Sequence, residues 1–168
     1  GVAHCPCSNM RLGSGVAPIP ELLAAGARVG IAVDGSSSNA GGHLLAEARQ
    51  ALLLQRAVKG AEAFRVAQAF ELATVGGAAV LNRNRWGRIG IGMAADVAMF
   101  RMDDIALAGA AGLDPLGALV LCHPPRADRV SVGGRTVVHD GHLVAADEAR
   151  LAADLNARAQ RLVAAADR

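Results

Sequence analysis

The sequence predicts an α/β fold, because segments typical of strands and of helices alternate in its first part. In its later part, the spacing of apolar residues becomes typical of strands. Apolar strands are expected at residues 1–4 and 28–33, with a short helix at residues 21–25 between them. Such a strand, helix, strand unit implies that the two strands are parallel. From Trp86 onward, alternating segments separated by glycine turns predict antiparallel strands instead.

Further helices are expected between the two parts. Residues 44–59 are good helix formers with an apolar face, and Gly60 follows them. Residues 65–74 predict another helix, and residues 75–81 a short third one, for which Thr74 is a plausible N-cap.

The later part predicts a small antiparallel sheet and a terminal helix. Strands are expected at residues 95–100, 129–132, 136–139 and 142–144, with Gly133-Gly134 and Asp140-Gly141 as turns. The last segment, residues 147–166, is rich in alanine and has leucines at helical spacing. We expect this helix to pack against another surface.

Composition excludes several classes of partner. The 168 residues are 52% hydrophobic and 19% charged, enough for one ordinary domain with a core. The net charge of +2 and the 2% aromatic content provide neither a basic footprint nor stacking platforms for nucleic acid. No apolar run approaches the roughly 20 residues of a membrane span, and the first residues lack the order of a signal peptide. We expect a cytoplasmic protein with no nucleic-acid or membrane partner.

The cysteine pattern agrees with a reducing compartment. The chain has three cysteines, Cys5, Cys7 and Cys122, which is an odd count and no disulfide framework. One Cys-x-Cys pair offers too few ligands for a structural zinc site.

Asp34 is the first candidate for a functional residue. The apolar run of residues 29–33 leads straight into it, and a glycine-serine loop follows. A carboxylate at the C-terminal end of a buried parallel strand lies where barrels and doubly wound folds place their chemistry. The alternative is that Asp34 only forms an Asx turn or a helix cap, and position alone does not decide between the two.

Several segments together carry a resemblance to a known family. They are His-Cys-Pro-Cys-Ser-Asn at residues 4–9, Arg-Leu-Gly-Ser-Gly-Val-Ala-Pro at 11–18, Val-Asp-Gly-Ser-Ser-Ser-Asn at 33–39, Gly-Met-Ala-Ala-Asp-Val at 92–97, Leu-Cys-His-Pro-Pro at 121–125 and Gly-Gly-Arg at 133–135. In this order they resemble motifs of the amidohydrolase superfamily. More narrowly, the chain is similar to metal-dependent aminohydrolases such as 8-oxoguanine deaminase and hydroxydechloroatrazine hydrolase.

The resemblance implies a fold. The chain would be the C-terminal part of a metal-dependent (βα)8 barrel, with His4 ending barrel strand seven and Asp34 ending strand eight. Residues 1–85 would belong to the barrel, residues 86–146 to a small β-sandwich, and residues 147–168 to a C-terminal helix.

The resemblance also implies an activity. Asp34 would ligate one divalent metal ion, zinc, and take the proton of its water during hydrolytic deamination of a guanine-type purine such as 8-oxoguanine, releasing ammonia. Residues expected to line the substrate pocket are His4, Ser8, Asn9, Ser36 and Ser37. The alternatives are an s-triazine or pterin substrate, or a non-catalytic fragment that binds a small ligand or only completes a barrel.

The other histidines depart from the family pattern. His43, His123, His139 and His142 form no His-x-His pair, and the ligands of the family's earlier strands have no counterpart. One carboxylate cannot hold a catalytic metal that needs about three protein ligands. We therefore expect either an inactive remnant or a chain that needs a missing N-terminal part of the same protein, with a homo-oligomer possible.

Three further residues are assigned structural roles. Asn39 is expected to cap the helix that begins at Leu44. His123 is expected in a rigid loop, and Trp86 in packing at the junction between the two parts of the chain.

Overall fold

The computed structural model describes residues 1–122 and 126–166. The chain forms two compact units: the first unit is Gly1–Ala94 with Arg101–Pro125, and the second unit is Ala95–Phe100 with Arg126–Arg168. The expected mixture of helices, parallel strands and antiparallel strands is confirmed. His123, for which a rigid loop was expected, lies outside the described residues.

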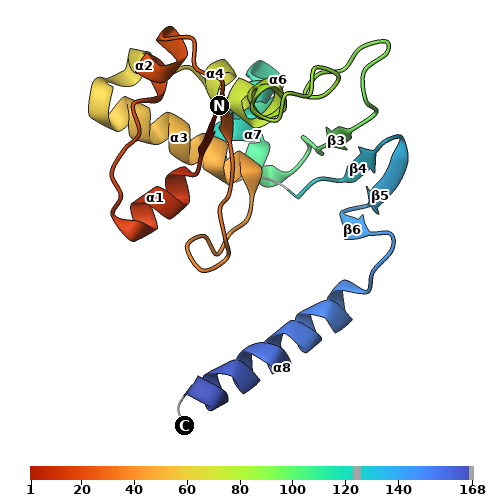
Figure 1. The fold of residues 1–168 in the computed structure, drawn as a ribbon. Coiled ribbons are helices and arrows are strands. Elements are labelled where there is room, and N and C mark those ends of the chain that lie inside the picture. Colours follow the sequence, from red (N-terminus) through yellow and green to blue (C-terminus); the bar gives the residue numbers. More distant parts are fainter. Residues whose placement is uncertain (123–125, 167–168) are drawn as a thin grey trace. The chain divides into compact units, whose positions relative to one another are not determined.

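The first unit consists of two strands and a set of helices (Figure 1). The strands are β1 (Val2–His4) and β2 (Val29–Ile31). They pair in parallel, with Val2 opposite Val29 and His4 opposite Ile31. The helices are α1 (Pro6–Leu12), α2 (Ile19–Ala24), α3 (Leu44–Lys59), α4 (Val66–Glu71), α5 (Gly77–Val80), α6 (Ala110–Leu113) and α7 (Pro115–Leu121). Short 3-10 turns lie at Ala61–Ala63 and Ile105–Leu107.

Helix α1 was not expected from the sequence. Pro6 starts it at a position where a missing N–H costs nothing, and Gly13 ends it in the left-handed region with φ of 66°. Ser8 and Asn9 therefore lie on a helix that begins two residues after β1, rather than in a loop. Helix α3, by contrast, has the predicted bounds.

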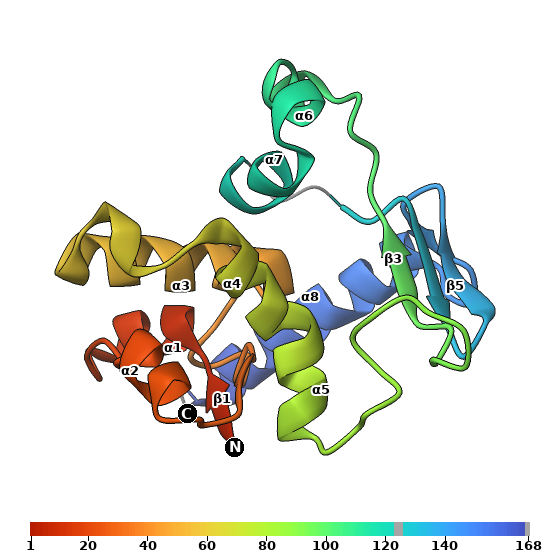
Figure 2. The same ribbon diagram turned by 90° about the horizontal axis from the view of Figure 1, so that it is seen from above.

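The predicted break at Thr74 is wrong. Helix α4 continues through a π-helical turn, Leu72–Gly76, into α5 without a cap (Figure 2). Thr74 lies inside that turn, and its hydroxyl donates a hydrogen bond to the Phe70 carbonyl at 3.0 Å. A hydroxyl that bonds back along a helix lets the helix continue, so Thr74 does not begin a new one.

The core of the first unit lies where α3 and α4 pack together and α7 contacts both. Phe64, Ile19, Leu52 and Val120 are completely buried. Val120 belongs to α7, so the chain leaves the first unit after Ala94 and re-enters it at Arg101 to complete this core.

The second unit is built on a four-stranded antiparallel sheet in the order β3-β4-β5-β6. Its strands are β3 (Val97–Met99), β4 (Arg129–Val132), β5 (Arg135–His139) and β6 (His142–Leu143). Gly133 and Gly134 both have positive φ, which a two-residue hairpin of this kind requires. The predicted meander is confirmed.

The terminal helix α8 (Glu148–Ala166) forms where it was predicted, but it has no buried residue. Its leucines are all exposed, from 52% at Leu151 to 72% at Leu162. Among the described residues of the second unit, the helix therefore buries none of its side chains, and the surface on which it was expected to pack stays a prediction. Among residues 1–122 and 126–166, no helix has the length and apolar character needed to cross a membrane.

A close backbone contact fixes β2 against the start of α5. A Cβ atom added at Gly30 would lie 2.7 Å from Gly77 Cα and 2.8 Å from Gly77 N. We predict that Gly30→Ala lowers the free energy of unfolding by about 1–3 kcal/mol, as overpacking does. Gly112→Ala is the matched control, because no atom of the described residues lies within 4 Å of its added Cβ. Urea denaturation of both variants tests this, and equal stabilities would contradict it.

Candidate active site

Asp34 follows β2 on the side where both parallel strands end. Its side chain is exposed, and its backbone has φ of 63°, in the left-handed region that aspartate tolerates better than most residues. The chain turns sharply here, so the loop after Asp34 folds back toward the strand end and α1.

Three donors hold the Asp34 carboxylate. The Ser8 hydroxyl donates to Oδ2 at 2.6 Å, the Ser38 hydroxyl donates to the same oxygen at 2.9 Å, and the Gly35 N–H donates to Oδ1 at 2.8 Å. The Ser8 hydroxyl, the Gly35 N–H and the Ser38 hydroxyl lower the pKa of Asp34 below its ordinary value. No ion pair to Asp34 is formed within the described residues. The carboxylate is therefore ionised near neutral pH and keeps its charge available.

A second carboxylate, that of Glu47, lies behind this loop. Glu47 belongs to the first turn of α3 and is 1% exposed. Its Oε1 accepts a hydrogen bond from Asn39 Nδ2 at 2.6 Å, and its Oε2 accepts one from the Cys7 backbone N–H at 3.0 Å. Sequence reasoning missed Glu47. The available signal was a charged residue on the apolar face of α3, four residues before the buried Ala51.

The predicted cap at Asn39 is wrong for this reason. Asn39 Nδ2 donates to the Val33 carbonyl at 2.7 Å as well as to Glu47, and Asn39 Oδ1 accepts from the Gly41 N–H at 3.1 Å. His43 occupies the N-cap position without a side-chain cap. Asn39 lies four residues before that position, and its Oδ1, the atom with which a cap accepts from the helix N–H groups, is already bound to Gly41.

His4 ends β1 and is buried, with 3% of its surface exposed. Burial lowers the pKa of His4, and the Glu47 carboxylate offsets part of that shift. Its ring is therefore neutral near pH 7, and no described residue forms a hydrogen bond with its Nε2. A neutral ring with a free nitrogen can donate to or accept from a ligand, depending on its tautomer.

The surroundings of the two N-terminal cysteines disfavour their charged forms. Burial and the Glu47 carboxylate raise the pKa of Cys7 to about 12. Burial and the charges of Asp34 and Glu47 raise the pKa of Cys5. Both thiols are therefore protonated near neutral pH in the metal-free chain, and a metal that bound them would have to displace those protons.

The remaining candidates divide into two groups. The structure brings Ser8, which is buried, into contact with Asp34. Asn9 is half-buried on α1, while Ser36 and Ser37 are exposed on the loop. Ser38, which sequence reasoning did not single out, makes the contact with Asp34 that its neighbours do not.

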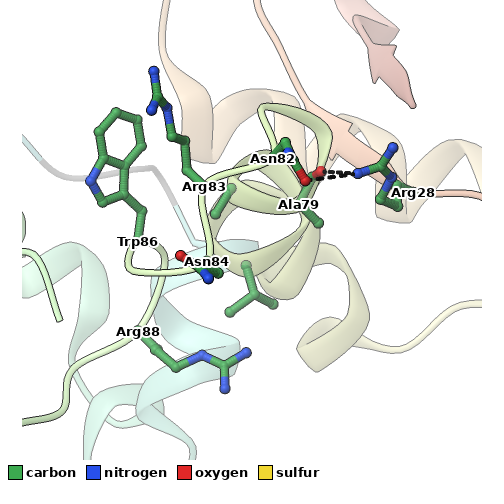
Figure 3. Close-up of a pocket in the computed structure, with 9 residues that line it drawn as sticks. Arg28, Ala79, Asn82, Arg83, Asn84, Trp86 and Arg88 are labelled. Atoms are coloured by element: carbon green, nitrogen blue, oxygen red, sulfur yellow. Dashed lines mark hydrogen bonds between the residues drawn. The ribbon is translucent and has the colours of Figure 1, made fainter. Parts of the chain in front are cut away.

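A pocket of about 430 Å³ lies at the other end of β2 from Asp34 (Figure 3). Arg28, which directly precedes β2, lines it and donates to the Ala79 carbonyl at 3.2 Å. Trp86 also lines it and is 40% exposed, with the Arg83 guanidinium 5.4 Å from its ring centroid. The Arg83 guanidinium thus lies over the Trp86 ring at this pocket, and packing of Trp86 at the junction stays a prediction.

The described residues do not complete a metal site by themselves. Within 1–122 and 126–166 there is no group of three or more His, Cys, Asp or Glu side chains placed to hold an ion. Asp34 offers one carboxylate, and a catalytic zinc needs about three protein ligands.

A strand-end carboxylate, the parallel pair and the motif order agree with the family indicated by the sequence. The model of the amidohydrolase family matches residues 1–144. The chain is 48% identical to an 8-oxoguanine deaminase of Pseudomonas aeruginosa over 164 residues, which are 98% of this chain and 36% of that protein. The chain belongs to the amidohydrolase family.

Solved structures give the same result. An adenosine deaminase of Xanthomonas campestris with bound zinc superposes with a TM-score of 0.90 at 29% identity, covering 97% of this chain and 37% of that one. A zinc complex of an atrazine chlorohydrolase of Arthrobacter aurescens has a TM-score of 0.86 at 36% identity, covering 92% and 35%. The chain spans about a third of the length of the relatives that it matches.

The contact between Ser8 and Asp34 can be tested directly. We predict that Ser8→Ala raises the pKa of Asp34 toward its ordinary value, because the first donor holding the charged form is lost. Ser36→Ala is the control, since Ser36 is exposed on the same loop. A carboxyl carbon NMR titration of the metal-free protein measures both. An unchanged Asp34 pKa in Ser8→Ala would contradict the assignment.

Proposed function

We propose that the complete protein is a metal-dependent hydrolase that removes an exocyclic amino group from a heterocycle and releases ammonia. The observation that carries this proposal is the ionised, hydrogen-bonded carboxylate of Asp34 at the C-terminal end of a parallel strand. The 48% identity to an 8-oxoguanine deaminase supports a guanine-type purine as the substrate.

The proposal includes a place for the chain in a larger fold. β1 and β2 are proposed as strands seven and eight of a (βα)8 barrel, within residues 1–85. Residues 86–146 would contribute to a β-sandwich, and residues 147–168 would be the C-terminal segment, whose described part contains helix α8. The parallel register of β1 and β2 and the antiparallel sheet of the second unit support this division. We also propose a cytoplasmic location, supported by three free cysteines.

The role proposed for Asp34 follows from its chemistry. Hydrolytic deamination adds the oxygen of water to the ring carbon that carries the amino group. The amino group then takes up a proton that came from the water, and its bond to that carbon breaks to release ammonia. The attacking water must lose a proton, and a carboxylate beside it can accept that proton. Asp34 is held in the charged form with its charge unpaired, as this role requires.

A zinc ion is proposed as the cofactor, supported by the zinc in two related structures. Asp34 would provide one ligand, because a lowered pKa keeps a carboxylate ready to bind a cation. The other ligands are proposed to come from the part of the complete protein that corresponds to the unmatched two thirds of the relatives.

The proposed substrate contacts are His4, Ser8, Asn9, Ser36 and Ser37. His4 has the best support, because its buried Nε2 lacks a partner in the described structure. Ser8 is already bound to Asp34, so its hydroxyl would reach substrate only by sharing that contact. The exposed Ser36 and Ser37 are free to turn toward a ligand.

A triazine substrate is the second candidate. The 36% identity to an atrazine chlorohydrolase favours it, since an electron-poor ring carbon is attacked in both cases. The same Asp34 chemistry would apply, and only the groups contacting the ring would differ.

We predict that Asp34→Asn in the complete, zinc-loaded protein reduces turnover of 8-oxoguanine by at least about a hundredfold, because an amide cannot take the proton. Asp154→Asn, on the exposed helix α8, is the matched control and should leave turnover unchanged. Ammonia release measures both. A variant that keeps more than about a tenth of the activity would contradict the role of Asp34. If the parent protein acts on a triazine and not on 8-oxoguanine, the proposed substrate is wrong and the proposed role of Asp34 stands.

A further inference from the structure

The buried carboxylate of Glu47 contacts both segments that hold Asp34. On one side, Oε2 accepts from the Cys7 N–H, and Cys7 directly precedes Ser8, whose hydroxyl donates to Asp34. On the other side, Oε1 accepts from Asn39, and Asn39 directly follows Ser38, the second hydroxyl donor to Asp34.

Asn39 adds a third connection. The same Nδ2 that binds Glu47 donates to the Val33 carbonyl, and Val33 directly precedes Asp34. Asn39 thus ties the beginning of the loop of residues 33–39 to its end and the end to Glu47 of α3, while Glu47 also holds the first turn of α1.

We propose that Glu47 is a positioning residue for the proposed deamination: through Cys7 and Asn39 it sets where Ser8 and Ser38 hold the Asp34 carboxylate. The inference rests on the proposed function of Asp34, whereas the hydrogen bonds that support it are present whatever that function is. Glu47 does not touch Asp34 in any described contact, so it acts only through these neighbours.

The alternative is that Glu47 merely contributes to the stability of the first unit. Because Glu47 is buried under either role, a variant of Glu47 is expected to be less stable in both cases, and a stability measurement cannot distinguish the two roles. Gln55 provides the comparison: it lies on the same helix, is completely buried, and its Nε2 donates to the Ala17 carbonyl at 2.8 Å, away from Asp34. A variant of Gln55 removes a buried hydrogen bond of α3 without disturbing the loop.

The test compares Glu47→Gln with Gln55→Ala in the protein at its full natural length. Glutamine preserves the volume of Glu47 but replaces one of its two oxygens by an NH2 group, so either the Cys7 N–H or the Asn39 amide then faces a donor instead of an acceptor. We expect Glu47→Gln to lower kcat for the heterocycle by about a hundredfold with little change in KM, as a small displacement of a reacting group does. Gln55→Ala should leave kcat unchanged at a temperature where the protein is folded.

Amide hydrogen exchange provides a readout that does not depend on activity. Glu47→Gln should speed exchange in the peptide covering residues 33–39 but not in the β3–β6 sheet, whereas Gln55→Ala should not change that loop. If the parent protein turns over no heterocycle, the proposed function fails, and the exchange pattern still decides the role of Glu47.

The proposal is overturned if Glu47→Gln leaves both kcat and the exchange of residues 33–39 unchanged. It is also overturned if Gln55→Ala reproduces the effects of Glu47→Gln. Should Glu47→Gln fail to fold, Asn39→Ala breaks the same connection from the loop side and is judged by the same two measurements.

Discussion

The arrangement around Asp34 depends on the need of one buried carboxylate for hydrogen-bond donors. Glu47 is almost completely buried, and both oxygens find N–H donors, one from a side chain and one from the backbone. A buried hydrogen-bonding group that is left without a partner costs about 1–3 kcal/mol of stability. The start of α1 and the loop after β2 are therefore drawn to the same point at the beginning of α3.

Asp34 differs from Glu47 in what surrounds it. Its side chain is exposed, and its donors are two hydroxyls and one backbone N–H rather than a cation. Hydroxyl donors stabilise the negative charge without cancelling it, and a hydroxyl can rotate when a ligand arrives. Two carboxylates close to one strand end thus have separate tasks: a buried one that organises the backbone and an exposed one available for chemistry.

Local patterns determined the elements that were predicted well. The helix formers of α3, the apolar run of β2 and the glycine turns of the β3–β6 sheet need few distant contacts to be recognised. Asp34 could be chosen for the same reason, since the end of an apolar strand is visible in the sequence.

The errors arose where a distant contact decides. Asn39 was expected to cap α3, but it bonds to Glu47 and Val33, which depends on how the loop folds back. Thr74 was expected to start a helix, yet the packing of β2 against the π-helical turn carries the helix through it. The position of Glu47 on the apolar face of α3 could have been noticed, but the sequence does not show that its side chain contacts α1 and the loop after β2.

Anomalous diffraction at the zinc edge from crystals of the complete protein tests the central claim most directly. The account predicts zinc with an Asp34 carboxylate oxygen at about 2.0–2.2 Å, the usual distance for such a ligand. It also predicts Ser8 and Ser38 still donating to that carboxylate. A fully occupied zinc site from which Asp34 is absent would contradict the assignment of this strand end as the site of the chemistry.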